Sequence, residues 1–228
     1  RCYAEALAGA GHELGLLEPN PTAALTALSS RLGITVHAAA GPWLSTFSKI
    51  IVTVSGGQAL SVLRSLLPFL SAGSVCLDFT TASRADKRTA ADELARSNVR
   101  YADVAIMGSV TLNGPRTPLL VAGTASDTAL SIAGALGAPA TALSDSAAGD
   151  AITIKLLRSL FTKGLEALTV ECMIAAERQG LVDALFSTLS DIEQVSLRSY
   201  LEMLTRTHVV HARRREREVA EAGTQVRG

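Results

Sequence analysis

A lysine inside a helix-like stretch is the first residue of this sequence that could do chemistry. The stretch GDAITIKLLRSLFTKGLEAL runs from Gly149 to Leu168, and Lys155 and Ser159 lie four residues apart in it, which places them on one helix face. Desolvation by the neighbouring leucines lowers the pKa of a lysine, which can then exchange a proton with a hydroxyl or carbonyl group. The alternative is a surface lysine whose stem covers the core while its ammonium reaches water.

Polar or glycine-containing segments end three of the apolar runs that we predict to be strands. Open α/β sheets bind ligands at the carboxyl ends of their strands, so these segments are candidates for a binding site. Serine and threonine are also common in such turns for capping reasons alone, which is the structural alternative for each. The candidates are Val54, Ser55 and Gly56 beside a cofactor, and Thr80, Thr81, Met107, Gly108 and Ser109 beside a substrate.

An acidic residue, Glu18, ends the first apolar run of the chain. In a dinucleotide-binding unit an acid at this place hydrogen-bonds the ribose hydroxyls of NAD and repels the ribose phosphate of NADP. The glycine-rich loop that would precede the helix-like Arg1–Gly9 is not in the sequence, which begins where that loop would end. Glu18 therefore favours NAD over NADP, with a plain surface acid as the alternative.

These residues need a scaffold, and the order of elements predicts one. Residues 1–145 alternate apolar strand-like runs with helix-like runs, which is typical of a parallel sheet covered by helices on both faces. The strand-like runs are Glu13–Leu17, Lys49–Ser55, Ser74–Thr80, Arg100–Met107 and Pro118–Gly123, and the turn-rich Asn113–Pro118 is expected to join neighbouring strands. We predict an α/β fold with a Rossmann-type, doubly wound parallel sheet as the NAD(P)-binding domain.

The pattern changes near Ser146, and residues 146–228 are expected to form an all-α domain for substrate binding and dimerisation. Helical periodicity extends from Asp150 to about Gln179, and Gly180 is placed to end the helix. Shorter helices are expected at 181–190, 191–206 and 207–222. The long helix is apolar on more than one face, which favours burial against a second copy of the chain. The residues that carry this expectation are Ile152, Leu156, Leu160, Leu165, Leu168 and Met173.

Composition excludes several classes of protein. Hydrophobic residues make up 48% and charged residues 18% of the 228 residues, with a formal net charge of zero. These values argue against disorder and give no support for binding to nucleic acid or to a membrane surface. Three separated cysteines and the lack of a long apolar run or signal peptide favour a cytoplasmic protein with small buried thiols. His208 and His211 share a helix face, but no third ligand is evident, so we expect no metal site.

Three stretches resemble the β-hydroxyacid dehydrogenase superfamily, which includes 6-phosphogluconate and 3-hydroxyisobutyrate dehydrogenases. AEALAGAGHELGLLEPNP resembles the first helix, second strand and acidic strand end of that family. DFTTASRADKRTAADELARSNVRYADVAIMGSV resembles its substrate-loop signature, and GDAITIKLLRS resembles the signature that contains its reacting lysine. The later stretches LLRSLFTKGLEALTVECMIAAERQGL and HVVHARRREREV are similar to a phosphogluconate-dehydrogenase-like branch.

The resemblance implies an enzyme that moves a hydride between NAD or NADP and a small acidic hydroxy or oxo substrate. It implies that Lys155 is the general acid and base, and it leaves His211 and Arg213 as possible contacts to an acidic substrate. The chain departs from the family pattern at Thr80, Met107, Ser109 and Ser159, which affects the substrate more than the reaction. The alternatives are a non-catalytic binding protein that keeps the fold and a relative of imine reductases.

Overall fold

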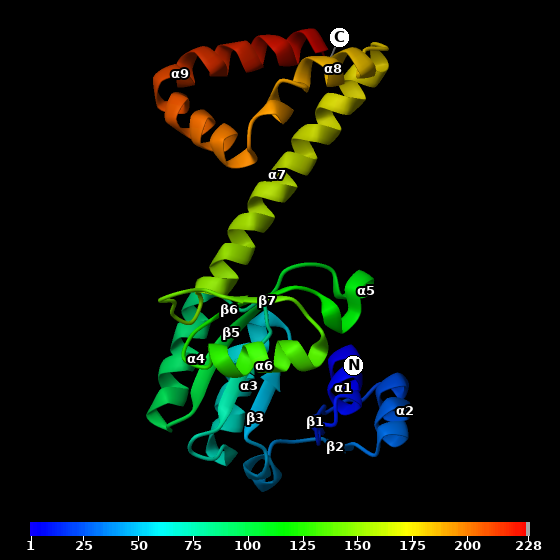
Figure 1. Ribbon diagram of the computed structural model, residues 1–228, viewed down its shortest axis with the longest axis vertical. Helices are drawn as coiled ribbons and strands as arrows, with labels where there is room; N and C mark the ends of the chain where they lie inside the picture. Colours follow the sequence, from blue (N-terminus) through cyan, green and yellow to red (C-terminus); the bar gives the residue numbers. More distant parts are fainter. Residues whose placement is uncertain (227–228) are drawn as a thin grey trace. The chain divides into compact units, whose positions relative to one another are not determined.

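The computed structural model describes residues 1–226, which divide into two compact units (Figure 1). The first unit spans Arg1–Ser159 and the second begins at Leu160. The division falls inside the long helix α7 (Asp150–Arg178), so Lys155 belongs to the first unit. No helix in the described part of the chain is both long and apolar enough to cross a bilayer.

A five-stranded sheet forms the centre of the first unit, with the strands in sequence order. Its strands are β3 (Lys49–Val52), β4 (Val75–Asp78), β5 (Arg100–Ile106), β6 (Leu119–Ala122) and β7 (Ala140–Ala142). The expected α/β class is confirmed, but the sheet is not wholly parallel, because β6 runs antiparallel to β5. The segment between them contains only the short helices α5 (Val110–Asn113) and η4 (Gly114–Arg116), and neighbouring strands without a crossover run antiparallel.

A separate pair of parallel strands, β1 (Gly15–Leu17) and β2 (Thr35–His37), follows the first helix α1 (Cys2–Gly9). The connection between these strands is α2 (Ala23–Leu32), which Thr22 caps by accepting the Leu25 N–H. The sequence patterns did not predict β2 or β7. Both are three residues long and, unlike the equally short β1, contain no pair of large apolar residues that would mark a strand.

Helices cover both faces of the five-stranded sheet, as the apolar strands predicted. Val75 and Leu77 of β4 pack in a cluster that includes Leu7 of α1 and residues of α6 (Ser126–Leu136). Cys76, which points the other way, packs with residues of α3 (Ala59–Leu66) and α4 (Arg84–Arg96). This burial on both faces is typical of an interior strand in a sheet that helices cover on both sides. The remaining short helices are η1 (Pro42–Thr46), η2 (Gly56–Gln58) and η3 (Leu67–Phe69).

The first turn of α7 is held to the sheet domain by side-chain contacts. Asp150 accepts a hydrogen bond from the Ala147 N–H at 2.9 Å and from Arg84 of α4 at 2.8 Å. The pKa of Asp150 is lowered by the Ala147 hydrogen bond and then by Arg84. Gly149 has φ 88°, and a Cβ there would lie 2.9 Å from the carbonyl oxygen of Arg84. Glycine is therefore required where the chain enters α7.

The second unit is helical throughout most of its described length. After α7, Gly180 with φ 68° ends the helix as expected, and α8 (Val182–Leu189), η5 (Ile192–Gln194) and α9 (Leu197–Val226) follow. The predicted break between 206 and 207 is wrong, because residues 197–222 contain no glycine or proline to end the helix. The ribbon of α9 bends part-way along its length instead (Figure 1).

The cysteines differ in their surroundings. All three are free thiols, and only Cys76 is buried, whereas Cys2 is half-buried and Cys172 is exposed on α7. The expectation that they serve as small buried hydrophobic residues is therefore correct for Cys76 and wrong for Cys172.

Candidate active site

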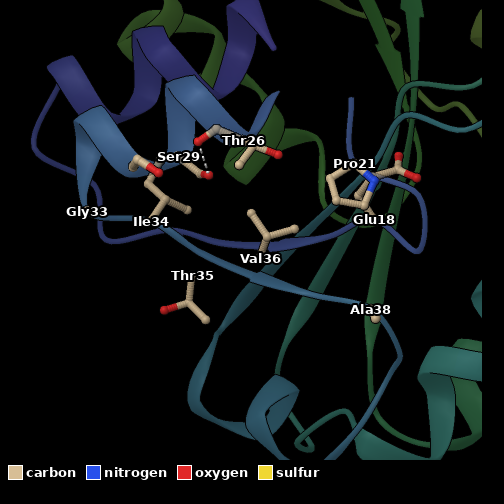
Figure 2. A pocket seen from close by; sticks show the side chains of 10 residues that line it. Glu18, Pro21, Thr26, Ser29, Gly33, Ile34, Thr35, Val36 and Ala38 are labelled. Atoms are coloured by element: carbon tan, nitrogen blue, oxygen red, sulfur yellow. Dashed lines mark hydrogen bonds between the residues drawn. The ribbon is translucent and has the colours of Figure 1, made fainter. Parts of the chain in front are cut away.

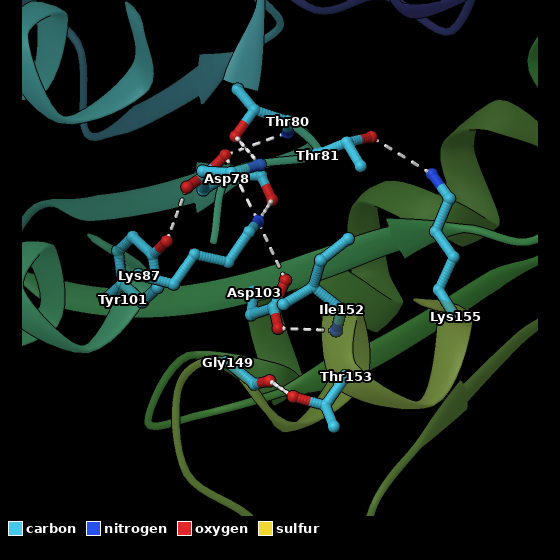
Figure 3. A network of polar contacts seen from close by, with 11 residues as sticks. Asp78, Thr80, Thr81, Lys87, Tyr101, Asp103, Gly149, Ile152, Thr153 and Lys155 are labelled. Carbon is cyan, nitrogen blue, oxygen red and sulfur yellow. Dashed lines mark hydrogen bonds and ion pairs between the residues drawn. The ribbon is translucent and has the colours of Figure 1, made fainter. Parts of the chain in front are cut away.

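Lys155 of α7 faces the loop that follows β4. Its Nζ donates a hydrogen bond to Thr81 Oγ1 at 3.3 Å (Figure 3). The lysine is half-buried, whereas Thr81 is exposed, so the pair lies at the border between the protein interior and solvent. Burial lowers the pKa of Lys155, and the positive charge of Lys87 lowers it further, while Asp103 opposes the shift. A lysine in this setting is easier to deprotonate than one on an open surface.

A buried ionic network lies between the strand ends and the first turn of α7. Lys87 of α4, which is 0% exposed, lies 2.8 Å from Asp103 Oδ1 and 3.4 Å from Asp78 Oδ1. Its Nζ also donates to the carbonyl oxygen of Asp78 at 3.0 Å. The second oxygen of Asp103 accepts the backbone N–H of Ile152 at 2.9 Å, and Ile152 is one turn before Lys155 (Figure 3).

Tyr101 completes this network on β5. Its hydroxyl donates to Asp78 Oδ2 at 2.5 Å, and burial followed by the charge of Asp78 raises the pKa of Tyr101 far above its ordinary value. Tyr101 is therefore neutral and acts as a hydrogen-bond donor at physiological pH. Sequence reasoning missed the network, because its members lie on α4, β4, β5 and α7 and no local pattern joins them.

Two neighbouring threonines of the predicted substrate loop have different surroundings. Thr80 is buried, its N–H donates to Asp78 Oδ1 at 2.8 Å, and its hydroxyl accepts the Ala82 N–H at 3.3 Å. These bonds form a tight turn that leaves Thr81 exposed beside Lys155. Thr81 thus lies where a substrate group could be reached, and Thr80 shapes the turn.

The predicted cofactor segment after β3 packs against the same turn. Val54 joins the core cluster that contains Val52 and Cys76, and the Ser55 hydroxyl donates to Gln58 at 2.7 Å. A Cβ at Gly56 would lie 2.4 Å from the carbonyl oxygen of Thr81, closer than any real contact. Only glycine allows so close an approach between this segment and the turn after β4, and the segment therefore lies next to Thr81.

The segment after β5 reaches the base of α7. Met107 packs against a small cluster that includes Ala151 of the first turn of α7. Gly108 lies against Thr117, since a Cβ there would be 3.3 Å from its methyl group, and Ser109 precedes the short helix α5. Ser159 is half-buried one turn beyond Lys155 on α7. Met107 thus lies beside the first turn of α7, and Ser159 lies on the same helix as Lys155.

Glu18 lies apart from Lys155, beside a pocket of about 360 Å³ near the end of β1. Its backbone N–H donates to the His37 carbonyl at 3.0 Å, and its carboxylate accepts the Asn20 N–H at 3.1 Å. Figure 2 shows Glu18 and Pro21 at one end of the pocket and Ser29, Gly33 and Ile34 at the other. The remaining lining residues are Thr26, Ser30, Thr35, Val36 and Ala38.

His211 and Arg213 belong to α9 of the second unit, where His211 is half-buried and Arg213 is exposed. Lys163 is exposed on α7, in the second unit, beyond the division at Leu160. The proposed roles of His211 and Arg213 towards an acidic substrate stay predictions.

Comparison with protein families gives a match that covers most of the first unit. The model of the NAD binding domain of 6-phosphogluconate dehydrogenase matches residues 2–141. Among curated proteins, an uncharacterised 28.5 kDa protein from Methanothermus fervidus is 36% identical over 73 residues. That alignment covers 32% of this chain and only 29% of the relative, so it carries no conclusion about the whole protein.

Solved structures show the same architecture over nearly the whole chain. A conserved protein described as structurally similar to 3-hydroxyacid dehydrogenases is 25% identical, with a TM-score of 0.73 over 96% of this chain and 82% of that one. A 3-hydroxyisobutyrate dehydrogenase from Salmonella typhimurium is 21% identical, with a TM-score of 0.66 over 92% and 74%. An imine reductase variant from Myxococcus stipitatus in complex with NAD+ is 16% identical, with a TM-score of 0.75 over 91% and 73%. The last two comparisons concern the fold alone.

Proposed function

The chain belongs to the family of the NAD-binding domain of 6-phosphogluconate dehydrogenase, and from this premise we propose that it is an NAD(P)-dependent oxidoreductase. The substrate that we propose is a small acidic molecule with a hydroxyl group, or the corresponding oxo compound. The observation that supports this proposal best is the pairing of the half-buried Lys155 with Thr81 at 3.3 Å.

The residues around Glu18 fit the adenosine side of a dinucleotide. The carboxylate lies near the carboxyl end of β1, is oriented by the Asn20 N–H, and borders a pocket of about 360 Å³. Carboxylate oxygens accept hydrogen bonds from ribose hydroxyls, and a negative charge repels a ribose phosphate. Glu18 therefore supports a preference for NAD, while Val54, Ser55 and Gly56 would lie along the cofactor nearer to Thr81.

The chemistry requires a proton carrier and a donor to the substrate. The nicotinamide ring, when bound, accepts the hydride from an alcohol carbon or supplies it to a carbonyl carbon. Lys155 takes the hydroxyl proton in oxidation and returns it to the carbonyl oxygen in reduction, and its lowered pKa makes the neutral form accessible. The Thr81 hydroxyl holds the ammonium in place and donates to a substrate carboxylate, and Met107, Gly108, Ser109 and Ser159 are proposed to border the same substrate.

A substrate screen tests this function. The full-length protein is incubated with NAD or NADP and a panel of small 3-hydroxy acids, and nicotinamide absorbance is followed. We expect turnover with at least one hydroxy acid. Turnover confined to cyclic imines would assign the protein to imine reduction instead. Binding of neither cofactor in a fluorescence titration would support a non-catalytic protein that keeps the fold.

We also propose that two copies of the chain associate through the helical unit. Apolar side chains are exposed on several faces of α7, and a helix that is apolar all round requires a partner. A second copy with the same surface provides one, because a two-fold interface joins identical patches. The large apolar residues exposed on α7 are Ile154, Leu156, Leu157, Leu160, Phe161, Leu165, Leu168, Val170 and Ile174.

A further inference from the structure

Lys87 is a buried cation that the proposed reaction does not use. Its side chain is 0% exposed, although lysine is among the residues least often buried. It lies on α4 and reaches two carboxylates that come from different strands, Asp78 of β4 and Asp103 of β5. A charge buried this deeply requires close partners, and removing one partner of a buried pair is strongly destabilising.

Each of the two carboxylates holds one side of the candidate site through a backbone hydrogen bond. Asp78 accepts the N–H of Thr80 and thereby fixes the turn that presents Thr81. Asp103 accepts the N–H of Ile152 at 2.9 Å and thereby fixes the turn of α7 that precedes Lys155. Lys87 bridges both carboxylates (Figure 3). Through the backbone N–H groups that these carboxylates accept, one ammonium group is connected both to the turn that carries Thr81 and to the helix turn before Lys155.

We propose that Lys87 is a positioning residue for Lys155. By binding both Asp78 and Asp103, it holds the two backbone segments that bring Lys155 and Thr81 together. The inference rests on the proposed function for the statement that Lys155 carries the proton. The bridge that Lys87 forms between Asp78 and Asp103 is independent of that function, because the distances that define it involve no cofactor or substrate.

The same arrangement gives Lys87 an electrostatic effect on Lys155. The charged groups that act on Lys155 are Lys87 of α4, whose charge lowers its pKa, and Asp103 of β5, whose charge raises it. Thr81, from the loop after β4, contributes a neutral hydroxyl. Lys87 and Asp103 thus act on the pKa of Lys155 in opposite directions, and a neutral side chain of the same length in place of Lys87 would have no such effect.

The chain allows a direct test, because it contains only four lysines, at positions 49, 87, 155 and 163. Reductive methylation with ¹³C-formaldehyde labels accessible lysines, and Lys87 is protected by its burial. The resonance of Lys155 is assigned by its loss in Lys155→Met and is followed by NMR as pH is raised. In Lys87→Met we expect its titration midpoint to move up, because a positive neighbour is lost and the charge of Asp103 is uncompensated.

Asp103→Asn provides the second arm and is expected to fold, because Lys87 keeps the carboxylate and the carbonyl oxygen of Asp78 as partners and the asparagine oxygen can still accept the Ile152 N–H. Here the midpoint of Lys155 should move down, since the charge that opposes Lys87 is removed. The matched control is Asp150→Asn, also in the first turn of α7, whose charge is not among those that act on Lys155. In Asp150→Asn the titration midpoint of Lys155 should stay at the wild-type value.

Opposite shifts in the two variants support the proposal, and an unchanged midpoint in Asp103→Asn overturns it even if Lys87→Met does not fold. The titration needs neither cofactor nor substrate, so it is independent of the proposed function. If wild-type protein transfers hydride, Lys87→Met should also lower kcat roughly 10–100-fold with little change in KM, as expected of a misplaced proton carrier. If the Lys155 midpoint shifts as expected in both variants but the protein transfers no hydride, the bridge through Lys87 is supported and only the proposed oxidoreductase function is refuted.

Discussion

At the residue scale, the candidate site joins two residues that the sequence singled out separately, and it includes others that the sequence did not indicate. Lys155 stood out because it lies in an apolar helix, and Thr81 because it follows a buried strand. Their pairing at 3.3 Å needs the end of β4 and α7 to meet, over a separation of 74 residues. The bridge through Lys87 was not predictable, because its polar partners Asp78 and Asp103 are read in sequence as ordinary parts of strands.

Glu18 gives a prediction about the choice of cofactor. We expect NAD to bind the full-length protein more tightly than NADP, because the carboxylate repels the ribose phosphate by about 1–3 kcal/mol, or roughly tenfold or more in affinity. Glu18→Gln should remove most of the difference. Fluorescence titration with both reduced cofactors measures it.

The control for this prediction is Glu13→Gln, an exposed acid that precedes β1 rather than following it. It should keep the wild-type preference. Equal or tighter binding of NADP by the unmodified protein would contradict the assignment of Glu18.

At the element scale, the elements with a strong apolar pattern were predictable, and two short strands without one were not. Helix α7 was expected from Asp150 to about Gln179 and ends at Arg178, since Gly180 adopts the left-handed conformation that stops a helix. The three-residue strands β2 and β7 gave no signal. The antiparallel direction of β6 depends on the path of the connecting residues 107–118. A pattern of apolar residues does not predict that path.

Gly56 gives a prediction at this scale. In Gly56→Ala the new Cβ would lie 2.4 Å from the Thr81 carbonyl oxygen, so the loop after β4 must shift. We expect a loss of about 1–3 kcal/mol in the free energy of unfolding, as is usual for overpacking, and a loss of turnover as Thr81 moves away from Lys155. Denaturant unfolding and steady-state kinetics measure the two effects.

Gly57→Ala is the matched control, because a Cβ at Gly57 meets nothing within 4 Å. This neighbouring glycine should tolerate the methyl group in both stability and turnover. If the two alanine variants behave alike, the close approach of Gly56 to Thr81 does not position the site.

At the scale of the whole molecule, the exposed apolar residues of α7 predict a homodimer. We expect a dimer in sedimentation velocity at micromolar concentration, and Leu168→Arg, at a position 58% exposed, should shift it towards monomer by placing a charge in the interface. Leu112→Arg, at a position 83% exposed on α5 of the first unit, should leave the dimer intact. A monodisperse monomer of the unmodified protein would refute the prediction.

In the proposed reaction Lys155 carries the proton, and turnover of Lys155→Met tests this role most directly. Oxidation should rise with pH as Lys155 of the wild type loses its proton, at a pH below that of an ordinary lysine, because burial lowers its pKa. Lys155→Met should lose about 10²–10⁴-fold in kcat while cofactor binding is nearly unchanged, and Lys155→Arg should lose almost as much, since guanidinium does not act as a base near neutral pH.

Lys163→Met is the control on the same helix, two turns further along and exposed, and it should keep most of the activity. The measurement is the ratio of kcat between each variant and the wild type, with a hydroxy acid that the screen identifies. We expect a loss of at least about a hundredfold in kcat for Lys155→Met alone. Turnover of Lys155→Met within roughly tenfold of the wild type would contradict it and leave Lys155 as a structural charge.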